Sequence, residues 1–232
     1  MLDYKPSMAT LGNLTGKLLC QADLARTDAC IDDYRITVRN IAQKILNESE
    51  AALADAATNL TKVIGSATRI LTHSYSSTVK RALELVSNSG RRPVVYVTRS
   101  NPGNEGEALA YDLKKVNLQT EVVQERVINS VMSNVDLVVL GADSVLSNGS
   151  VINKIGTRAI AIEAKSRNIM TYVACETNKF STASFLGEQI EISDIFDVTP
   201  NTLVSKFVTE GGFVEPEEVE ERIKVMLREL YT

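Results

Sequence analysis

The 232-residue sequence predicts an α/β protein, with a helical N-terminal region at residues 1–65 and an α/β domain at residues 66–232. As far as Gly65, apolar residues recur at helical spacing. Beyond Gly65, short apolar runs alternate with amphipathic segments of about a dozen residues. Strands that are apolar on both faces and separated by helices are typical of a parallel sheet covered on both sides. These observations predict a Rossmann-like parallel sheet domain that follows a short helical region.

The N-terminal region contains two predicted helices. Pro6 and Ser7 suit the first turn of the first helix. Thr27 or Asp28 is a candidate cap for a longer second helix, which stops at Gly65. The apolar positions at helical spacing are Met8, Leu11, Leu14, Leu18 and Leu19 in the first helix, and Ile31, Tyr34, Val38, Ile41, Ile45, Leu46, Leu53, Ala56 and Leu60 in the second.

The α/β domain contains six apolar runs that we predict to be strands of the parallel sheet. They are residues 70–72, 94–97, 120–123, 135–140, 171–174 and 195–198. The amphipathic segments 77–88, 105–116 and 157–167 are the predicted helices between them. The final segment, 216–230, has an acidic start and one apolar face, so we expect a helix that packs against the domain.

Composition and charge narrow the class of protein. The net charge of −4 disfavours a nucleic-acid partner, because phosphate contacts need clustered Lys and Arg. No signal peptide is recognisable at the N-terminus, and no uncharged apolar run reaches the ~18 residues of a membrane span. We therefore expect a cytoplasmic protein without membrane contact, and neither a metal nor a cofactor.

The cysteines and the histidine also favour a cytoplasmic protein without a metal site. Cys20, Cys30 and Cys175 are an odd number without metal-ligand spacing, which favours a reducing compartment. Cys175 lies at the end of a predicted strand, where we expect a buried and inert thiol. His73 is the only histidine, which excludes a His-rich metal site. It follows the first strand, where a structural role is favoured over a catalytic one.

Polar residues follow four of the predicted strands. These segments are residues 72–78, 98–103, 141–144 and 175–180. Ligands of open parallel sheets bind beyond the carboxyl ends of the strands. The four segments therefore predict a shared polar pocket.

The segment from Gly141 to Thr157 is the richest of these candidates. Gly141 allows a tight turn that would deliver Asp143 into the cleft, whereas Asn153 and Lys154 are expected to lead directly into a helix. A helix N-terminus favours an anion, and Lys154 adds a full positive charge. A phosphate is the expected occupant. The alternative is that Asp143 and Asn153 are turn residues and Lys154 is a solvated charge.

Two further groups of residues have open roles. Lys179, in a polar loop, is either an ordinary surface lysine or a pocket residue. The hydroxyl and N–H groups of the serines after the first strand either cap the next helix or bind an anion. These serines are Ser74, Ser76 and Ser77.

The segment from Gly141 to Thr157 resembles the signature of a known family. That family joins the alpha, beta and delta subunits of translation initiation factor 2B and their archaeal relatives with the isomerases of ribose 1,5-bisphosphate and methylthioribose 1-phosphate. The resemblance extends, in the same order, to residues 5–13, 70–76, 98–102, 176–180 and 196–200. It indicates a short archaeal-type member with a trimmed helical region.

The resemblance implies roles for individual residues. Asp143 matches the acid that the isomerases use for proton transfer, and Lys179 matches a basic residue of the same pocket. Asn153 and Lys154 match sugar-phosphate contacts. The remaining candidates for ligand binding are Ser7, Ser76, Ser77, Thr98, Arg99 and Thr157. Family members form dimers or assemblies of dimers, so the resemblance also implies a homo-oligomer.

Two departures from the isomerase pattern bear on the chemistry. Ser74 occupies the position of an isomerase cysteine, and a serine hydroxyl is far less acidic than a thiol with a pKa of about 8.5. The isomerases carry Glu-Thr-Arg-Pro after the second strand, whereas this sequence has Arg99-Ser-Asn-Pro102. Both changes fall at positions where an isomerase would bind the bisphosphate and place the proton acceptor.

Three functions remain open from the sequence. The leading hypothesis is a non-catalytic protein similar to a translation initiation factor 2B subunit, which binds a sugar phosphate or a nucleotide such as AMP and contacts translation initiation factor 2. The alternative is an aldose–ketose isomerase of a ribose bisphosphate, with Asp143 as the acid–base residue and Ser74 at the cysteine position. A third possibility is a metabolic sensor without a role in translation.

Overall fold

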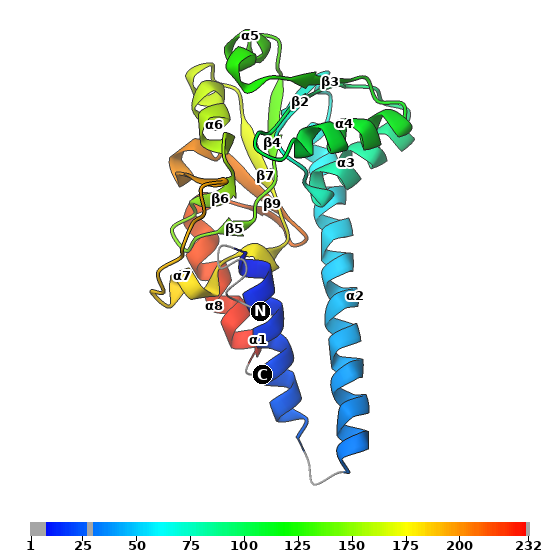
Figure 1. The fold of residues 1–232 in the computed structure, drawn as a ribbon, viewed down its shortest axis with the longest axis vertical. Coiled ribbons are helices and arrows are strands. Elements are labelled where there is room, and N and C mark those ends of the chain that lie inside the picture. The colour runs from blue at the N-terminus through cyan, green and yellow to red at the C-terminus, as the bar shows by residue number, and fades with distance from the viewer. Residues whose placement is uncertain (1–7, 27–29, 231–232) are drawn as a thin grey trace.

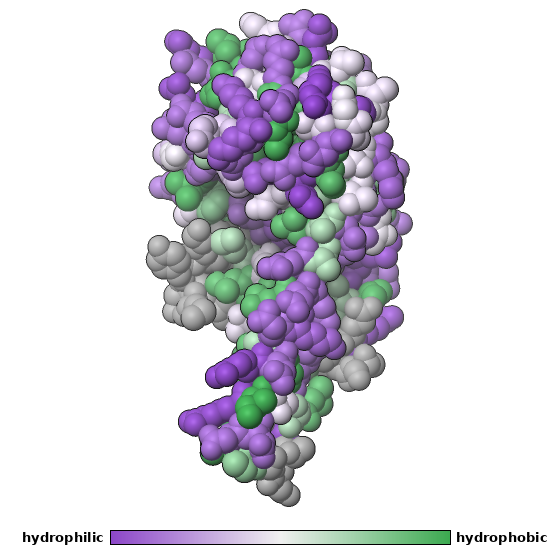
Figure 2. All heavy atoms as spheres, turned by 90° about the vertical axis from the view of Figure 1, so that its right-hand side faces the viewer, coloured by the Kyte–Doolittle hydropathy of each residue, from purple (hydrophilic) through white to green (hydrophobic). Residues whose placement is uncertain are grey.

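The computed structural model describes residues 8–26 and 30–230. Figure 1 shows an α/β body from which two helices project. They are α1 (Ala9–Leu24) and α2 (Ile31–Ile64), the latter 34 residues long. The C-terminal part of α2 packs against α3 and β9, and buries Ala57 and Leu60 there. Its N-terminal half leaves Ile31 and Ile36 exposed, and Figure 2 shows apolar groups among hydrophilic side chains on the projecting part.

The body is built on a seven-stranded sheet in the order β10-β9-β7-β4-β1-β2-β3. All neighbours are parallel except β10, which pairs antiparallel with β9. The strands are β1 (Arg69–Thr72), β2 (Val94–Thr98), β3 (Thr120–Val123), β4 (Leu137–Leu140), β7 (Thr171–Ala174), β9 (Lys206–Thr209) and β10 (Gly212–Val214). The mostly parallel sheet and the preceding helices confirm the predicted fold class.

Helices cover both faces of this sheet. The helices that follow α2 are α3 (Ser77–Asn88), α4 (Glu105–Lys115), α5 (Ile128–Met132), α6 (Thr157–Ser166), α7 (Thr182–Phe185) and α8 (Val219–Leu230). Alternate residues of one strand point to opposite faces. Ile70 of β1 accordingly joins a core with α2, α3 and α4, whereas Leu71 joins a second core with α5, α6 and α8. This two-sided burial explains why the strands are continuous apolar runs.

A second, antiparallel sheet corrects two expectations. It contains β5 (Ser144–Val145), β6 (Val151–Lys154) and β8 (Phe196–Thr199). The run at 195–198 therefore forms a strand, but in this small sheet and not in the parallel one. A four-residue apolar run indicates that a strand is buried, but it does not indicate which strand it pairs with. Asn153 and Lys154 end β6 instead of forming the turn that opens a helix.

The sequence pattern does not predict the remaining strands. Strands β5 and β10 have only two and three residues, which is too short for a recognisable pattern. Strand β9 has four residues, as many as several of the predicted strands, and sequence reasoning missed it. The predicted helix over 216–230 is present as α8, after a turn in which Glu215 and Glu218 form a capping box. Among the described residues, no helix has the length and apolar character of a membrane span.

Candidate functional site

A cavity of about 270 Å³ lies beyond the carboxyl ends of β1 and β4. Its walls come from the start of α3, the end of β6, the first residue of α4 and the loop after β7. The residues that line it are His73, Ser74, Tyr75, Ser76, Ser77, Glu105, Gly141, Ala142, Asp143, Asn153, Lys154, Lys179, Ile195 and Phe196.

The structure brings most of the candidate residues to this one cavity. Those that line it are Ser74, Ser76, Ser77, Asp143, Asn153, Lys154 and Lys179. Thr98, Arg99 and Thr157 do not line it. Ser7 lies outside the described residues. The polar segments after β1, β4 and β7 thus converge, although they are far apart in the sequence.

The N-terminus of α6 differs from the expected anion site. Gly156, with φ of 106°, precedes the helix, and its N–H donates to Asp197 Oδ2 at 2.8 Å. The N–H of Arg158 donates to the same carboxylate at 3.2 Å. The anion at this helix end is therefore Asp197 of the chain itself. Its carboxylate supplies the charge that the helix dipole favours, so these amides are engaged by the chain itself rather than open to a ligand phosphate.

The N-terminus of α3 faces the cavity instead. Ser76 and Ser77 line it, and Ser76 Oγ accepts from the N–H of Val79 as a helix cap. The first amides of a helix lack intrahelical acceptors, which suits them to an anion. Gly141 permits this arrangement, because a Cβ there would lie 2.6 Å from Ser76 Cβ. The end of β4 and the start of α3 can therefore lie in direct contact.

Two lysines supply positive charge to the cavity. The Lys154 side chain is 5% exposed, and its Nζ lies 2.7 Å from Glu105 Oε1. Lys179 Nζ lies 3.6 Å from Glu176 Oε2, and Glu176 is in turn held by the Thr78 hydroxyl at 2.5 Å. Both ammonium groups are thus positioned by buried or half-buried carboxylates rather than solvated.

A hydrogen bond to Thr157 fixes the Asn153 side chain. Asn153 Nδ2 donates to Thr157 Oγ1 at 2.9 Å, and that hydroxyl donates to the Lys154 carbonyl at 2.6 Å. Thr157 is fully buried. Its contacts make it a residue that positions Asn153 at the cavity.

His73 is fully buried between three segments of chain. Its Nε2 lies 2.9 Å from the Ile155 carbonyl and therefore donates, so that Nδ1 accepts from the Thr98 hydroxyl at 2.5 Å. Burial lowers the pKa of His73 below its usual value. These contacts are those of a neutral, structural imidazole, and they also explain why Thr98 is turned away from the cavity.

The loop after β2 carries Arg99 away from the cavity. Arg99 Nε pairs with Glu107 Oε1 at 2.9 Å, where both side chains are largely exposed. Ser100 in the same loop accepts from the Ser74 N–H at 2.8 Å, and its own N–H donates to Glu125 at 2.5 Å. The loop therefore fixes the backbone of Ser74, while its arginine lies outside the pocket.

Cys175 is fully buried, as expected from its place at the end of a strand. Burial raises the pKa of its thiol. A neutral, enclosed thiol is a poor proton donor or nucleophile.

Sequence reasoning misses several residues at the cavity. It places Glu105 only in a predicted helix, although this residue pairs with Lys154 49 residues away. Tyr75 and Phe196 add aromatic surface to the lining. Asp197 lies in a segment that resembles the family, but nothing local indicates that it caps α6. One sequence signal could have found Glu105: it is a polar residue in the first turn of a helix that follows a strand.

A second hollow, of about 280 Å³, lies between α1, α2 and the segment 177–182. Its charged groups already have partners: Lys17 pairs with Glu48 at 2.7 Å, and Glu210 accepts from the Thr177 N–H at 3.0 Å. Its lining includes none of the candidate residues. The smaller cavity at the strand ends is therefore the candidate site.

Comparisons with known proteins agree with this architecture. The model of the initiation factor 2 subunit family matches residues 1–194. The chain is 28% identical to a protein named ribose 1,5-bisphosphate isomerase from Thermococcus kodakarensis, over 93% of this chain and 75% of that protein. The solved structures that match include proteins named as initiation factors. The isomerases and the initiation factors named in the sequence analysis are thus both among the similar proteins.

One such structure is the translation initiation factor eIF-2B of Pyrococcus horikoshii, with a TM-score of 0.79 and 28% identity, over 93% of this chain and 78% of that chain. Another is a subunit of the tetrameric eIF2B-beta2-delta2 complex from C. thermophilum, with a TM-score of 0.80 and 21% identity, over 97% of this chain and 77% of that chain. The second likeness concerns the fold alone. With the family match covering most of its length, this chain belongs to the initiation factor 2 subunit family.

Proposed function

We propose that this chain is an initiation-factor-2B-like protein whose cavity binds a phosphorylated sugar or a nucleotide such as AMP, without isomerase chemistry. The observation that carries the proposal is the meeting of Lys154, Lys179 and the first turn of α3 at one cavity. Two ammonium groups and a helix N-terminus form an anion site of the kind that phosphates occupy. A volume of about 270 Å³ suits a small ligand.

The binding test uses thermal shift with AMP, ribose 5-phosphate and inorganic phosphate. Stabilisation should grow as RT ln(1 + [L]/Kd). Lys154→Met removes the buried charge and keeps the volume of the side chain, so we expect the shift to vanish. Lys165→Met is the matched control, because Lys165 lies on α6 and donates to the Thr202 carbonyl away from the cavity. An unchanged shift in Lys154→Met would contradict the proposed site.

The absence of isomerase chemistry rests on Ser74. A serine hydroxyl needs a strong adjacent base to exchange a proton at neutral pH. His73 is the neighbouring imidazole, but Thr98 and the Ile155 carbonyl engage both of its nitrogens. Cys175 cannot replace the missing thiol, because it is fully buried and does not line the cavity. Loss of an acid–base partner typically costs about 10²–10⁴-fold in rate.

The second candidate function is isomerisation of ribose 1,5-bisphosphate. Asp143 favours it, because this carboxylate lines the same cavity as Ser74 and the two lysines. The relative from Thermococcus kodakarensis bears that name. Incubation of the protein with ribose 1,5-bisphosphate tests it directly, with ribulose 1,5-bisphosphate as the product to detect. Turnover that Asp143→Asn abolishes would replace our proposal with this one.

We further propose that the chain assembles with itself as a dimer or an assembly of dimers, and that it contacts translation initiation factor 2. Support comes from the oligomeric complex among the structural neighbours. Sedimentation velocity tests self-assembly, and a sedimentation coefficient of a monomer at all concentrations would contradict it. Capture of purified initiation factor 2 separates a translation factor from a metabolic sensor, for which we expect no capture.

A further inference from the structure

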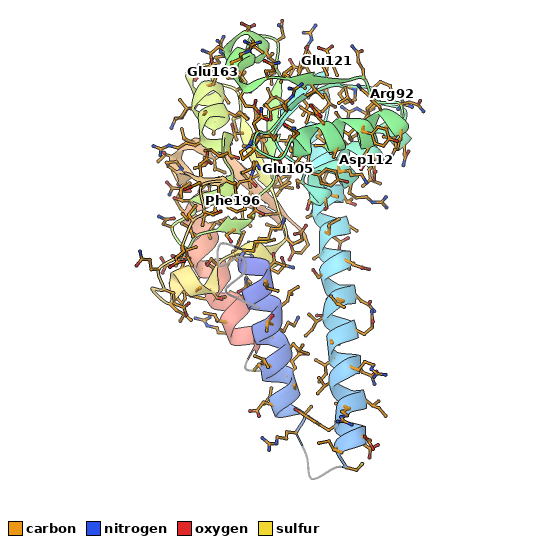
Figure 3. All side chains as sticks on the ribbon, viewed as in Figure 1. Arg92, Glu105, Asp112, Glu121, Glu163 and Phe196 are labelled. Carbon is orange, nitrogen blue, oxygen red and sulfur yellow. The ribbon has the colours of Figure 1, made fainter. Side chains whose placement is uncertain are left out.

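The Lys154 ammonium is already engaged by an internal carboxylate. Its Nζ lies 2.7 Å from Glu105 Oε1 and also donates to the Pro102 carbonyl. Lys154 and Glu105 both line the cavity. Figure 3 shows Glu105 at the end of α4 that faces the centre of the body. The positive charge assigned to a ligand phosphate is therefore paired before any ligand arrives.

The Glu105 carboxylate has a partner for one of its oxygens but not for the other. It is the first residue of α4, and its carboxylate packs against Gly103, where a Cβ would lie 2.6 Å from Oε1. Its Oε2 is buried and makes no hydrogen bond within the part of the chain that the structure describes. A buried oxygen without a donor costs free energy. The contact of its Oε1 with the Lys154 ammonium offsets part of this cost.

The two lysines of the cavity differ in this respect. Glu176, the partner of Lys179, is 5% exposed, is fixed by the Thr78 hydroxyl, and does not line the cavity. Glu105 carries a side chain that is 38% exposed, and its carboxylate is in the cavity wall. Glu176 therefore supports its lysine from outside the cavity lining, whereas Glu105 lines the same cavity as the lysine that it contacts.

We propose that Glu105 is an internal competitor for the ligand phosphate at Lys154, so that it sets the affinity of the pocket for phosphorylated ligands. This inference rests on the proposed function, namely that the cavity binds a phosphate. A phosphate carries about −1.5 to −2 charges at pH 7. It cannot share Lys154 with a carboxylate without like-charge repulsion, so binding is an exchange in which Glu105 leaves Lys154.

Glu107 provides a matched control on the same helix. It lies two residues from Glu105, and its partner is Arg99, outside the cavity. Glu105→Gln and Glu107→Gln change the net charge of the protein equally, and both lie in the first turn of α4. Only the first removes the charge that faces Lys154. A difference between them therefore reports the competition and not the overall electrostatic field.

The experiment is isothermal titration of the purified 232-residue protein with AMP and with inorganic phosphate. We expect Glu105→Gln to bind both about tenfold more tightly than the wild type, equivalent to ~1.4 kcal/mol. Glu107→Gln should stay within about twofold, well below the ~1.4 kcal/mol of a tenfold change. Glu105→Ala, which removes the carboxylate without an isostere, should also tighten binding, and thermal melting verifies that each variant is folded.

The possible outcomes separate the two proposals. If the wild type binds a phosphate and Glu105→Gln binds it equally or more weakly, Glu105 is no competitor, and a weaker affinity would make it an acceptor for a ligand hydroxyl. Equal tightening in Glu107→Gln would attribute the effect to net charge and would also overturn the inference. If neither the wild type nor any Glu105 variant binds AMP or phosphate, the proposed function itself fails.

Discussion

At the residue scale, His73 shows how burial and hydrogen bonding decide a role that the sequence leaves open. A histidine directly after a strand, beside polar residues, is compatible with catalysis. Here both nitrogens are engaged by Thr98 and the Ile155 carbonyl, and the ring packs over Gly156, where a Cβ would lie 3.0 Å from Cε1. The imidazole therefore joins β1, β2 and the loop before α6, and burial lowers its pKa, which favours the neutral form.

The pH dependence of stability tests this role. Burial lowers the pKa of His73, so the folded protein resists a proton that the unfolded chain accepts near its usual pKa of about 6.5. The contribution is fully present above that pH and is lost as the pH falls toward the lowered folded pKa. We expect urea midpoints to fall from pH 7.5 to 5.5, and to fall less in His73→Gln. Equal slopes in both proteins would contradict the assignment.

At the element scale, close approaches of backbone position the cavity. Helix α4 begins beside the end of β2, and a Cβ on Gly106 would collide with the Thr98 carbonyl oxygen. Glu105 is the neighbour of Gly106, so this contact fixes where the carboxylate enters the cavity wall. The capping of α6 by Asp197 acts in the same way, because it holds the loop that follows Lys154.

A pair of glycine substitutions tests the contact between α4 and β2. Gly106→Ala should destabilise the protein by more than ~2 kcal/mol, because backbone must shift on one side of the contact. Gly12→Ala is the control: a Cβ added at Gly12 in α1 would meet no atom within 4 Å, so helix propensity should make this change neutral or stabilising by ~0.5–1 kcal/mol. Urea denaturation measures both. A tolerated Gly106→Ala would show that α4 can move freely relative to β2.

At the scale of the whole molecule, burial is unevenly distributed along α2. Its C-terminal residues Ala56, Ala57, Leu60 and Ile64 are fully buried in or near the core between α2, α3 and the sheet. Its N-terminal half projects with α1, and Ile31 is 68% exposed. One continuous helix thus contains a part that is buried in the body and a part whose tertiary contacts are mainly with α1.

Hydrogen exchange should resolve these two parts. We expect amides of residues 35–44 to exchange faster than those of residues 56–64, because local opening of the projecting part exposes little apolar surface. Residues 137–140 of the central strand β4, which are buried throughout, provide the slow reference. Dilute protein is needed, since self-assembly would add protection. Uniformly slow exchange along α2 in dilute solution would contradict this division.

The sequence by itself determined the alternation of strands and helices and the polar segments that meet at the strand ends. Both follow from local pattern, because a strand buried on two faces is apolar throughout and a site for an anion needs polar donors. The tertiary structure alone decided that Asp197 occupies the N-terminus of α6, 41 residues from Gly156, and that Glu105 engages Lys154. Periodicity reports how deeply a residue is buried, whereas the partner of a charge depends on the path of the whole chain.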